Sequence, residues 1–370
     1  MYSINKNYSY LDLERLNNYV EKKLLRVNKK DDLFIYNYTD ECVFSKAWDE
    51  YTTICRGLVV NSSGEIIAKP LKKFFNINET EETMERNLPV EIPEVSEKID
   101  GSLIILYKYN DNYMFSTRGI FDSVQAVMAK KIFEKKYNYD GLSKYKGFTF
   151  CFEVVYPENI IVIDYRGIED LFLISVINNE TGVETSYEEA SKIAYELGFK
   201  CVSFTRMDIK NIDLDEKGKE GYVLRYSNGL RVKVKLNEYV RIARFLQSIT
   251  PKNIIEVLKR NIDPSSLYTA NREDIDLKVK EMVCGLKNRY DEIIYKVDKI
   301  YNETPKFESR KEYALYFMDK IKENKELSKF LFLKLDNKEE EYHCKVWDFI
   351  KNSKEISQYK RSILNDGSAE

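Results

Sequence analysis

The sequence EKIDGSLIILYKY occupies residues 97–109. Its β-branched and aromatic residues from Leu103 to Tyr109 predict a strand. Lys98 lies just before this strand, and the polar turn with Gly101 would let a ligand approach the backbone closely. A lysine two residues before Asp-Gly is common, however, and is also typical of a solvated turn. The rest of the chain must therefore decide between a ligand site and a plain turn.

Further charged residues lie on predicted strands downstream. Glu153 interrupts the apolar strand of residues 148–155, where a carboxylate is costly to bury unless something binds it. Glu220 begins another strand. Arg231, Lys233 and Lys235 share one face of a third strand, because side chains alternate along a strand. An exposed sheet face would tolerate three aligned cations, but an anion such as a triphosphate explains them better.

These motifs and their order resemble those of the covalent nucleotidyltransferase superfamily. They are Lys98-x-Asp-Gly101, the Glu153 strand, the Glu220-Gly strand and Lys233-x-Lys235. This superfamily contains ATP-dependent ligases and RNA capping enzymes. Other stretches narrow the resemblance to the phage-type RNA ligase 1 family, which repairs broken tRNA. They are residues 34–38, Cys55-Arg56-Gly57, residues 72–79, residues 152–162, and Tyr239 after the lysine strand. The resemblance covers roughly residues 30–245, and several separate motifs in the right order make chance a poor explanation.

The resemblance implies three nucleotidyl transfers. Lys98 would attack the α-phosphate of ATP to form a lysyl-adenylate, AMP would then move to an RNA 5′-phosphate, and a 3′-hydroxyl would displace AMP. A lysine amine attacks only when it is neutral, and its ordinary pKa of about 10.4 keeps it protonated at neutral pH. Nearby cations favour the neutral form, which is the role we expect for Lys233 and Lys235.

The same resemblance implies roles for further residues. Glu153 would bind the ribose hydroxyls, Glu220 would serve a metal or the nucleotide, and Tyr239 would act near the phosphates or RNA. Arg118 stands where the family has a lysine, and arginine contacts a phosphate differently. Core packing is the alternative role for the aromatic residues. The expected nucleotide contacts also include Tyr36, Arg56, Lys73, Phe75 and Gly101.

The family also requires Mg²⁺ or Mn²⁺, which suits carboxylate and phosphate oxygens. Glu220 and Asp263 are the expected metal ligands. The sequence contains no Gly-x-x-x-x-Gly-Lys-Ser/Thr motif, so a P-loop is not how ATP would be held.

Composition agrees with this chemistry. The chain contains one histidine, His343, which nearly excludes histidine triads and multi-histidine zinc sites. Lys and Arg number 59 against 61 Asp and Glu, which excludes a uniformly basic polycation but allows a local basic cleft. The six cysteines form no C-x-x-C pair, and no apolar run reaches membrane length. We therefore expect a monomeric protein away from membranes in the cytoplasm, or in the host cytoplasm if it is viral.

The predicted fold is α+β, with a nucleotidyltransferase domain of antiparallel sheets and flanking helices at residues 1–249 and an all-α domain at 250–370. Apolar residues three and four apart from Ile275 to Val297 predict a long helix, Ser309-x-x-Glu312 a capping box, and residues 342–350 another helix. Strands are predicted at residues 32–38, 54–60, 65–68, 103–109, 113–116, 148–155, 160–164, 171–177, 221–226 and 230–235, and N-terminal helices at 12–25, 123–136 and 186–197, the last ended by Gly198.

Three alternatives remain open. Capping guanylyltransferases and DNA ligases share the motifs, but they usually continue into a β-barrel, whereas this sequence continues with helical periodicity. A non-catalytic RNA-binding protein on a ligase scaffold is the second alternative, and an unrelated globular protein with accidental motifs is the third. The C-terminal helices are either a structural cap or a module that selects RNA, including cleaved tRNA with 3′-hydroxyl and 5′-phosphate ends.

Overall fold

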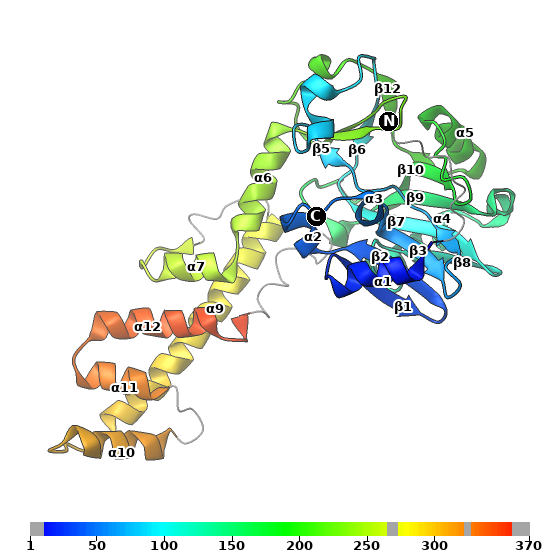
Figure 1. The fold of residues 1–370 in the computed structure, drawn as a ribbon. Coiled ribbons are helices and arrows are strands. Elements are labelled where there is room, and N and C mark those ends of the chain that lie inside the picture. The colour runs from blue at the N-terminus through cyan, green and yellow to red at the C-terminus, as the bar shows by residue number, and fades with distance from the viewer. Residues whose placement is uncertain (1–10, 265–272, 322–326, 357–370) are drawn as a thin grey trace. The chain divides into compact units, whose positions relative to one another are not determined.

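A computed structural model describes residues 11–264, 273–321 and 327–356 (Figure 1). The chain divides into two compact units, residues 1–241 and 242–370. Helix α6 (Asn237–Ser248) contains the point of division. The first unit is α+β and the second is helical, so the predicted fold class is confirmed.

The first sheet of the N-terminal unit has the strand order β1-β2-β3-β4, and all its pairs are antiparallel. One face is covered by α1, whose Leu16 is fully buried in a cluster with Tyr36 and Leu58. The elements of this layer are α1 (Leu13–Glu21), β1 (Leu25–Lys30), β2 (Leu33–Tyr38), α2 (Asp40–Phe44), α3 (Glu50–Ile54), β3 (Arg56–Asn61) and β4 (Ile66–Ala68).

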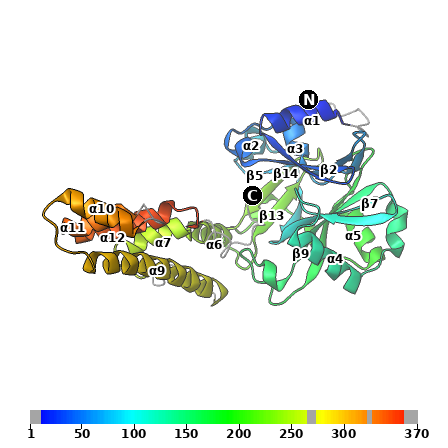
Figure 2. The same ribbon diagram turned by 90° about the horizontal axis from the view of Figure 1, so that it is seen from below.

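The second sheet has the order β11-β10-β9-β7-β8. Its strand β7 (Ser102–Tyr109), between β9 and β8, is buried on both faces over most of its length, which explains why the sequence there is a continuous apolar run. Ile104 and Leu106 pack with helices α4 and α5, whereas Leu103 and Ile105 pack against the first sheet. Figure 2 shows α4 and α5 beside this sheet. Its other elements are β8 (Asn112–Ser116), α4 (Val124–Lys136), β9 (Phe148–Val155), β10 (Asp170–Asn178), α5 (Tyr187–Leu197) and β11 (Lys200–Cys201).

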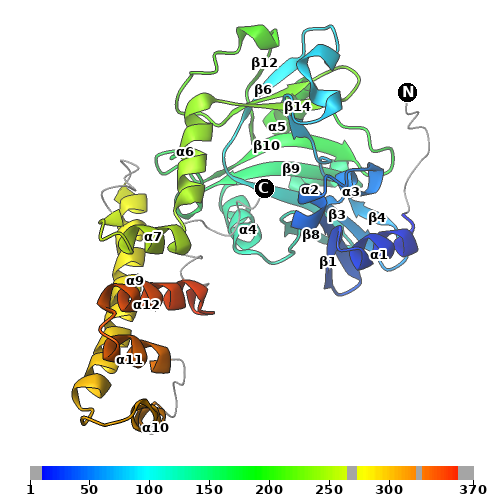
Figure 3. The same cartoon turned by 60° about the vertical axis from the view of Figure 1, so that its left-hand side comes forward.

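The third sheet has the order β12-β6-β13-β14-β5, and its strands β6 and β14, labelled in Figure 3, carry Lys98, Arg231, Lys233 and Lys235. Val95, Leu224, Val232 and Val234 bury one of its faces. Because side chains alternate, Lys98, Arg231, Lys233 and Lys235 share the opposite face. The strands are β5 (Phe75–Asn76), β6 (Glu94–Lys98), β12 (Phe204–Arg206), β13 (Gly221–Arg225) and β14 (Arg231–Lys235), and the unit's short 3₁₀ helices are Glu81–Thr83, Glu85–Asn87, Asp140–Tyr145, Pro157–Asn159 and Ile209–Asn211.

The second unit is built around the long helix α9 (Glu273–Asn302), against which α7, α11 and α12 pack. Val279, Met282, Leu286 and Val297 form its buried side, as their spacing predicts. The predicted capping box at Ser309 is present. The other helices are α7 (Pro251–Leu258), α10 (Arg310–Lys320), α11 (Ser328–Leu335) and α12 (Glu339–Asn352). Among the helices that the structure describes, none combines the length and hydropathy that a membrane span requires.

Several predicted elements are confirmed and two are wrong. Helices α4 and α5 lie at 123–136 and 186–197 within a residue, and Gly198 ends α5 in the left-handed conformation with φ 73°. The predicted helix 12–25 ends at Glu21, because the chain turns through Lys23 at φ 59° and enters strand β1. The predicted strand 160–164 is a loop, because two of its amides donate hydrogen bonds to a buried carboxylate.

Candidate active site

Lys98 and Lys235 share one buried carboxylate. Lys98 ends β6, and its Nζ donates to Glu220 Oε2 over 2.7 Å. Lys235 ends β14, and its Nζ lies 3.0 Å from Glu220 Oε1. Glu220 is only 2% exposed, and a carboxylate at that depth is tolerated because each oxygen has a cationic partner. The structure therefore brings together three of the residues predicted from the sequence.

Strand register explains this arrangement. Strand β13 lies between β6 and β14, and its first residue, Gly221, is opposite both Lys98 and Lys235. Glu220 immediately precedes it and so reaches both lysines. Gly221 has φ +154°, and a Cβ there would lie 2.0 Å from the carbonyl oxygen of Val234. Glycine is required at this position because a side chain would collide with the neighbouring strand.

Asp100 is the anchor of the loop that follows Lys98. It is 3% exposed, and its Oδ2 accepts hydrogen bonds from the amides of Val162 and Ile163 over 2.7 and 2.8 Å. Its Oδ1 accepts from the Tyr239 hydroxyl over 2.8 Å. Burial, followed by the charge of Glu220, raises the pKa of Asp100, and these hydrogen bonds oppose that rise. Segment 160–164 is a loop rather than the predicted strand because two of its amides bind this carboxylate instead of a neighbouring strand.

Gly101 brings the same loop against Glu153. Strand β9 pairs with β7, and Glu153 is opposite Leu103. A Cβ at Gly101 would lie 2.4 Å from the carbonyl oxygen of Val154 and 3.1 Å from Glu153 Cγ. The half-buried Glu153 side chain therefore lies beside the backbone of the Lys98 loop. The pairing of two predicted strands places these motifs together.

Two further cations flank an aromatic ring where β14 pairs with β5. Lys233 is 6% exposed and Arg56 is 8% exposed. Lys233 Nζ lies 5.1 Å from the ring centroid of Phe74, and Arg56 Cζ lies 6.0 Å from it. Strand β5 pairs with β14 in parallel, and Asn76 lies opposite Lys233. Phe74 directly precedes β5 and is therefore close to the lysine. Cation–π contacts of this kind help to hold two like charges close together.

Lys73 lies among aromatic side chains. Its Nζ is 5.5 Å from the ring centroids of Tyr38 and Trp48 and 5.4 Å from that of Phe75. Arg118 donates a hydrogen bond to the Tyr38 hydroxyl over 3.1 Å. The structure thus joins Lys73, Phe75 and Arg118, which the sequence predicted as separate nucleotide contacts.

Two predicted residues belong to other parts of the chain. Tyr36 is 2% exposed and packs in the core between the first sheet and α1, the alternative role considered for it. Asp263 belongs to the second unit, in an exposed stretch after α7. Their roles at adenosine and at a metal stay predictions.

Sequence reasoning missed several contacting residues. Phe74 and Tyr38 stood within stretches quoted for the resemblance, but nothing distinguished them from their neighbours. Trp48 lies in a polar stretch without strand or helix periodicity, so the sequence contains no signal for it. Arg231 was expected with Lys233 and Lys235 at an anion, whereas the structure pairs it with Glu184.

The donor groups fit a metal held mainly through a nucleotide. Within residues 11–264, 273–321 and 327–356, no group of three or more His, Cys, Asp or Glu side chains forms a metal site. Mg²⁺ at phosphates typically uses one or two carboxylates, with phosphate oxygens and waters as its other ligands. Glu220 and Glu153 are the carboxylates that the site offers for this purpose.

Known proteins resemble this chain over much of its length. A family model described as RNA ligase matches residues 54–239. An RNA ligase of Rhodothermus phage RM378 is 22% identical over 92% of this chain and 95% of its own length. A provisionally named RNA ligase of Thermovibrio ammonificans is 25% identical over 70% of this chain and 73% of its own.

A solved structure is also similar. A protein of Aquifex aeolicus, provisionally described as an ATP-dependent DNA ligase, is 20% identical, with a TM-score of 0.48 over 85% of this chain and 89% of that one. This identity and this TM-score are too low to support a conclusion about activity.

Proposed function

The chain belongs to the RNA ligase family, and we propose that it is an ATP-dependent member that joins RNA ends through a lysyl-AMP on Lys98. The observation that carries the proposal is the position of Lys98: its ammonium lies at the end of β6, paired with a buried carboxylate that also binds Lys235. A second cationic group beside a lysine is one of the arrangements that activate a nucleophilic amine.

The proposed reaction has three steps. The Lys98 amine loses its proton and attacks the α-phosphorus of ATP, so that a P–N bond forms as the bond to pyrophosphate breaks. An oxygen of an RNA 5′-phosphate then attacks the same phosphorus and releases the lysine. Finally, the 3′-hydroxyl of an RNA end loses its proton and attacks the 5′-phosphorus, and AMP leaves as the phosphodiester forms.

Each charged group has a role that its position supports. Lys233 and Lys235 would offset the negative charge that develops on the transferred phosphoryl group, since electrostatic stabilisation carries most of this kind of catalysis. Arg56, Lys73 and Arg118 would bind phosphate oxygens. Glu153, beside the Lys98 loop, would accept hydrogen bonds from the ribose hydroxyls. Phe75 and Tyr239 border the lysines and would contact the nucleotide.

Mg²⁺ or Mn²⁺ belongs to the same proposal. When bound, the ion would neutralise phosphate charge. Glu220 would hold it on this chain, and its ion pairs with Lys98 and Lys235 would then weaken, because three cations would share one carboxylate charge.

The natural substrate is a finer proposal. We infer RNA with a 3′-hydroxyl and a 5′-phosphate, including cleaved tRNA, acted on by a monomer in the cytoplasm or, for a viral protein, the host cytoplasm. The helical unit, with a domain boundary near residue 250, would select among such RNAs. Lys259 is a weak candidate for phosphate contact because it already pairs with Asp348 at 2.8 Å.

A substrate panel tests the proposal. The full-length protein is incubated with ATP and, in turn, with single-stranded RNA, cleaved tRNA, nicked RNA duplex and nicked DNA, and joined products are resolved on a denaturing gel. Joining of RNA but not of nicked DNA is the expected result. Label retained by the protein from GTP but not from ATP would instead favour a capping guanylyltransferase. Binding of RNA without any joining would favour the non-catalytic alternative.

A further inference from the structure

The lysine-bearing face of the third sheet is organised in rows. Register places Lys98, Gly221 and Lys235 side by side across β6, β13 and β14. In the same way, Arg225 lies beside Arg231 two rows away along the same strands. Because side chains alternate, Arg231 projects from the same face of β14 as Lys233 and Lys235. A contact that holds Arg231 in place therefore also orients the face of β14 that carries Lys233 and Lys235.

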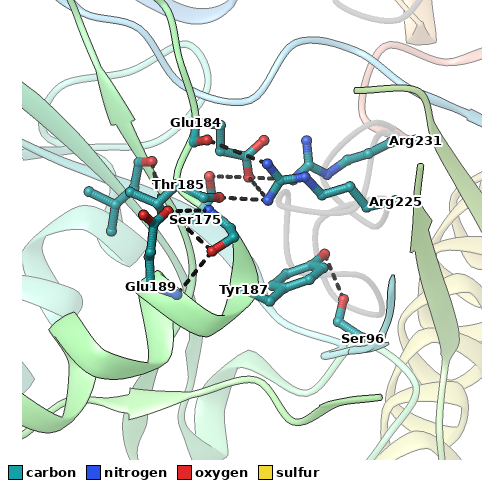
Figure 4. A network of polar contacts seen from close by, with 10 residues as sticks. Ser96, Ser175, Glu184, Thr185, Tyr187, Glu189, Arg225 and Arg231 are labelled. Carbon is teal, nitrogen blue, oxygen red and sulfur yellow. Dashed lines mark hydrogen bonds and ion pairs between the residues drawn. The ribbon is translucent and has the colours of Figure 1, made fainter. Parts of the chain in front are cut away.

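Glu184, in the segment between β10 of the second sheet and α5, makes that contact. It follows β10, and its backbone forms an isolated bridge with Ile177 of that strand. Its carboxylate forms an ion pair with Arg231, and its Oε1 lies 3.8 Å from Arg225 NH1 (Figure 4). The Ser175 hydroxyl of β10 donates to Oε1 over 2.6 Å. One carboxylate thus connects the sheet that contains Glu153 to the strand that contains Lys233 and Lys235.

Neighbouring contacts restrain the same joint. Arg225 NH1 donates to the Thr185 carbonyl oxygen over 2.6 Å. The Ser96 hydroxyl of β6 donates to the Tyr187 hydroxyl over 2.8 Å. The segment 184–187 therefore contacts all three central strands of the third sheet, β6, β13 and β14, on their charged face.

The joint is buried, and its charges depend on one another. The side chains of Arg231, Glu184 and Arg225 are 9, 14 and 15% exposed. Burial alone would lower the pKa of Arg231, but Glu184 raises it above its ordinary value. A buried ion pair is weak evidence for stability as such, but its geometry is directional and restricts how two elements can be arranged.

We propose that Glu184 is a positioning residue for nucleotidyl transfer, which holds β14 through Arg231 so that Lys233 and Lys235 face the nucleotide beside Lys98. This inference rests on the proposed function, since it assumes that these lysines act on the transferred phosphoryl group. Loss of the contact would let β14 shift relative to the second sheet. A mutation far from the reacting atoms that misplaces a reacting group by about 1 Å can cost about a hundredfold in rate.

The experiment compares two buried carboxylates of the same region. Glu184→Gln removes the charge that holds Arg231. Asp170→Asn is the matched control, because Asp170 is 4% exposed, begins β10 and pairs at 3.0 Å with both Lys136 and Lys200, none of which lies in the third sheet. The double variant Glu184→Gln/Arg231→Gln removes both buried charges, so that neither is left unpaired.

The measurement is the single-turnover rate of lysyl-AMP formation at saturating ATP, together with the half-saturating ATP concentration, below the melting temperature of each variant. We expect Glu184→Gln to lower the rate at saturating ATP by about tenfold or more with a smaller change in half-saturation. Asp170→Asn should keep the wild-type rate even if its melting temperature falls equally. The double variant should fold and stay slow.

Three results would overturn the inference: a wild-type rate in Glu184→Gln, an equal loss of rate in Asp170→Asn, or, should Glu184→Gln not fold, a wild-type rate in the double variant. Failure of the wild-type protein to form any lysyl-AMP would have a different meaning, because it would contradict the proposed function before any variant is compared.

Discussion

Lys98 Nζ lies 2.7 Å from Glu220 Oε2, and the other oxygen of this carboxylate lies 3.0 Å from Lys235. The proposed lysine nucleophile and the lysine proposed to stabilise the transferred phosphate are therefore held by one buried group. In the proposed reaction the attacking amine must lose its proton, and the ion pair with Glu220 favours the protonated form. Glu220 is thus placed to influence both the orientation and the release of Lys98.

Glu220→Gln tests this relationship. The amide keeps the shape but cannot form ion pairs with both lysines, and we expect formation of lysyl-AMP to fall by at least about tenfold. Quantification of labelled protein after a brief incubation with α-labelled ATP measures it. Wild-type labelling would mean that Glu220 has only a structural role.

Gly101→Ala should impair both folding and activity. The added Cβ would lie 2.4 Å from the Val154 carbonyl oxygen, and backbone contacts of this kind cannot relax cheaply. We expect a loss of about 1 to 3 kcal/mol in the free energy of unfolding, measured by urea denaturation, and reduced lysyl-AMP formation. Gly198→Ala is the control, because a Cβ there meets nothing within 4 Å and its cost is conformational. Similar activity in the two variants would contradict the close approach of Glu153 to the loop.

Tyr239→Phe removes a hydrogen bond from the buried carboxylate of Asp100. A hydroxyl donates more strongly to a carboxylate than to a carboxylic acid, so the cost should grow as Asp100 ionises. Burial raises the pKa of Asp100, and loss of the bond raises it further. The variant should therefore lose about 2 kcal/mol of unfolding free energy at pH 7 and less at acidic pH. Urea titrations across this range would contradict the account if the loss were constant.

Asp170→Asn removes a buried carboxylate whose pKa is lowered in the folded protein. Burial alone would raise the pKa of Asp170, but hydrogen bonds from Tyr137, Lys136 and Lys200 bring it below its ordinary value. A lowered carboxyl pKa contributes stability above the unfolded value of about 3.9, and that contribution is lost as the pH falls through the folded pKa. The variant should be less stable by about 2 to 4 kcal/mol at pH 7, and the difference should shrink in acid. Urea titrations that show the same difference in unfolding free energy at the lowest pH as at pH 7 would contradict this prediction.

Strand alternation and motif order predicted much of the site. The shared face of Lys233 and Lys235 follows from the sequence because alternation is local to one strand. The Glu184–Arg231 ion pair does not, since it joins the segment after β10 to a strand of a different sheet and nothing near Glu184 indicates its partner. The apolar run at 160–164 was predicted as a strand because periodicity cannot reveal that a distant carboxylate, Asp100, binds its amides. Long-range polar contacts are the part that the sequence pattern leaves undetermined.

The most direct test of the central claim is the site of covalent attachment of AMP. The protein is incubated with α-labelled ATP and a divalent metal, denatured and digested, and the labelled peptide is identified by mass spectrometry, with Lys98→Ala and Lys108→Ala treated in parallel. We predict AMP on Lys98, no label in Lys98→Ala, and normal label in Lys108→Ala, whose lysine lies near the far end of β7. AMP on another residue, or full labelling of Lys98→Ala, would contradict the account.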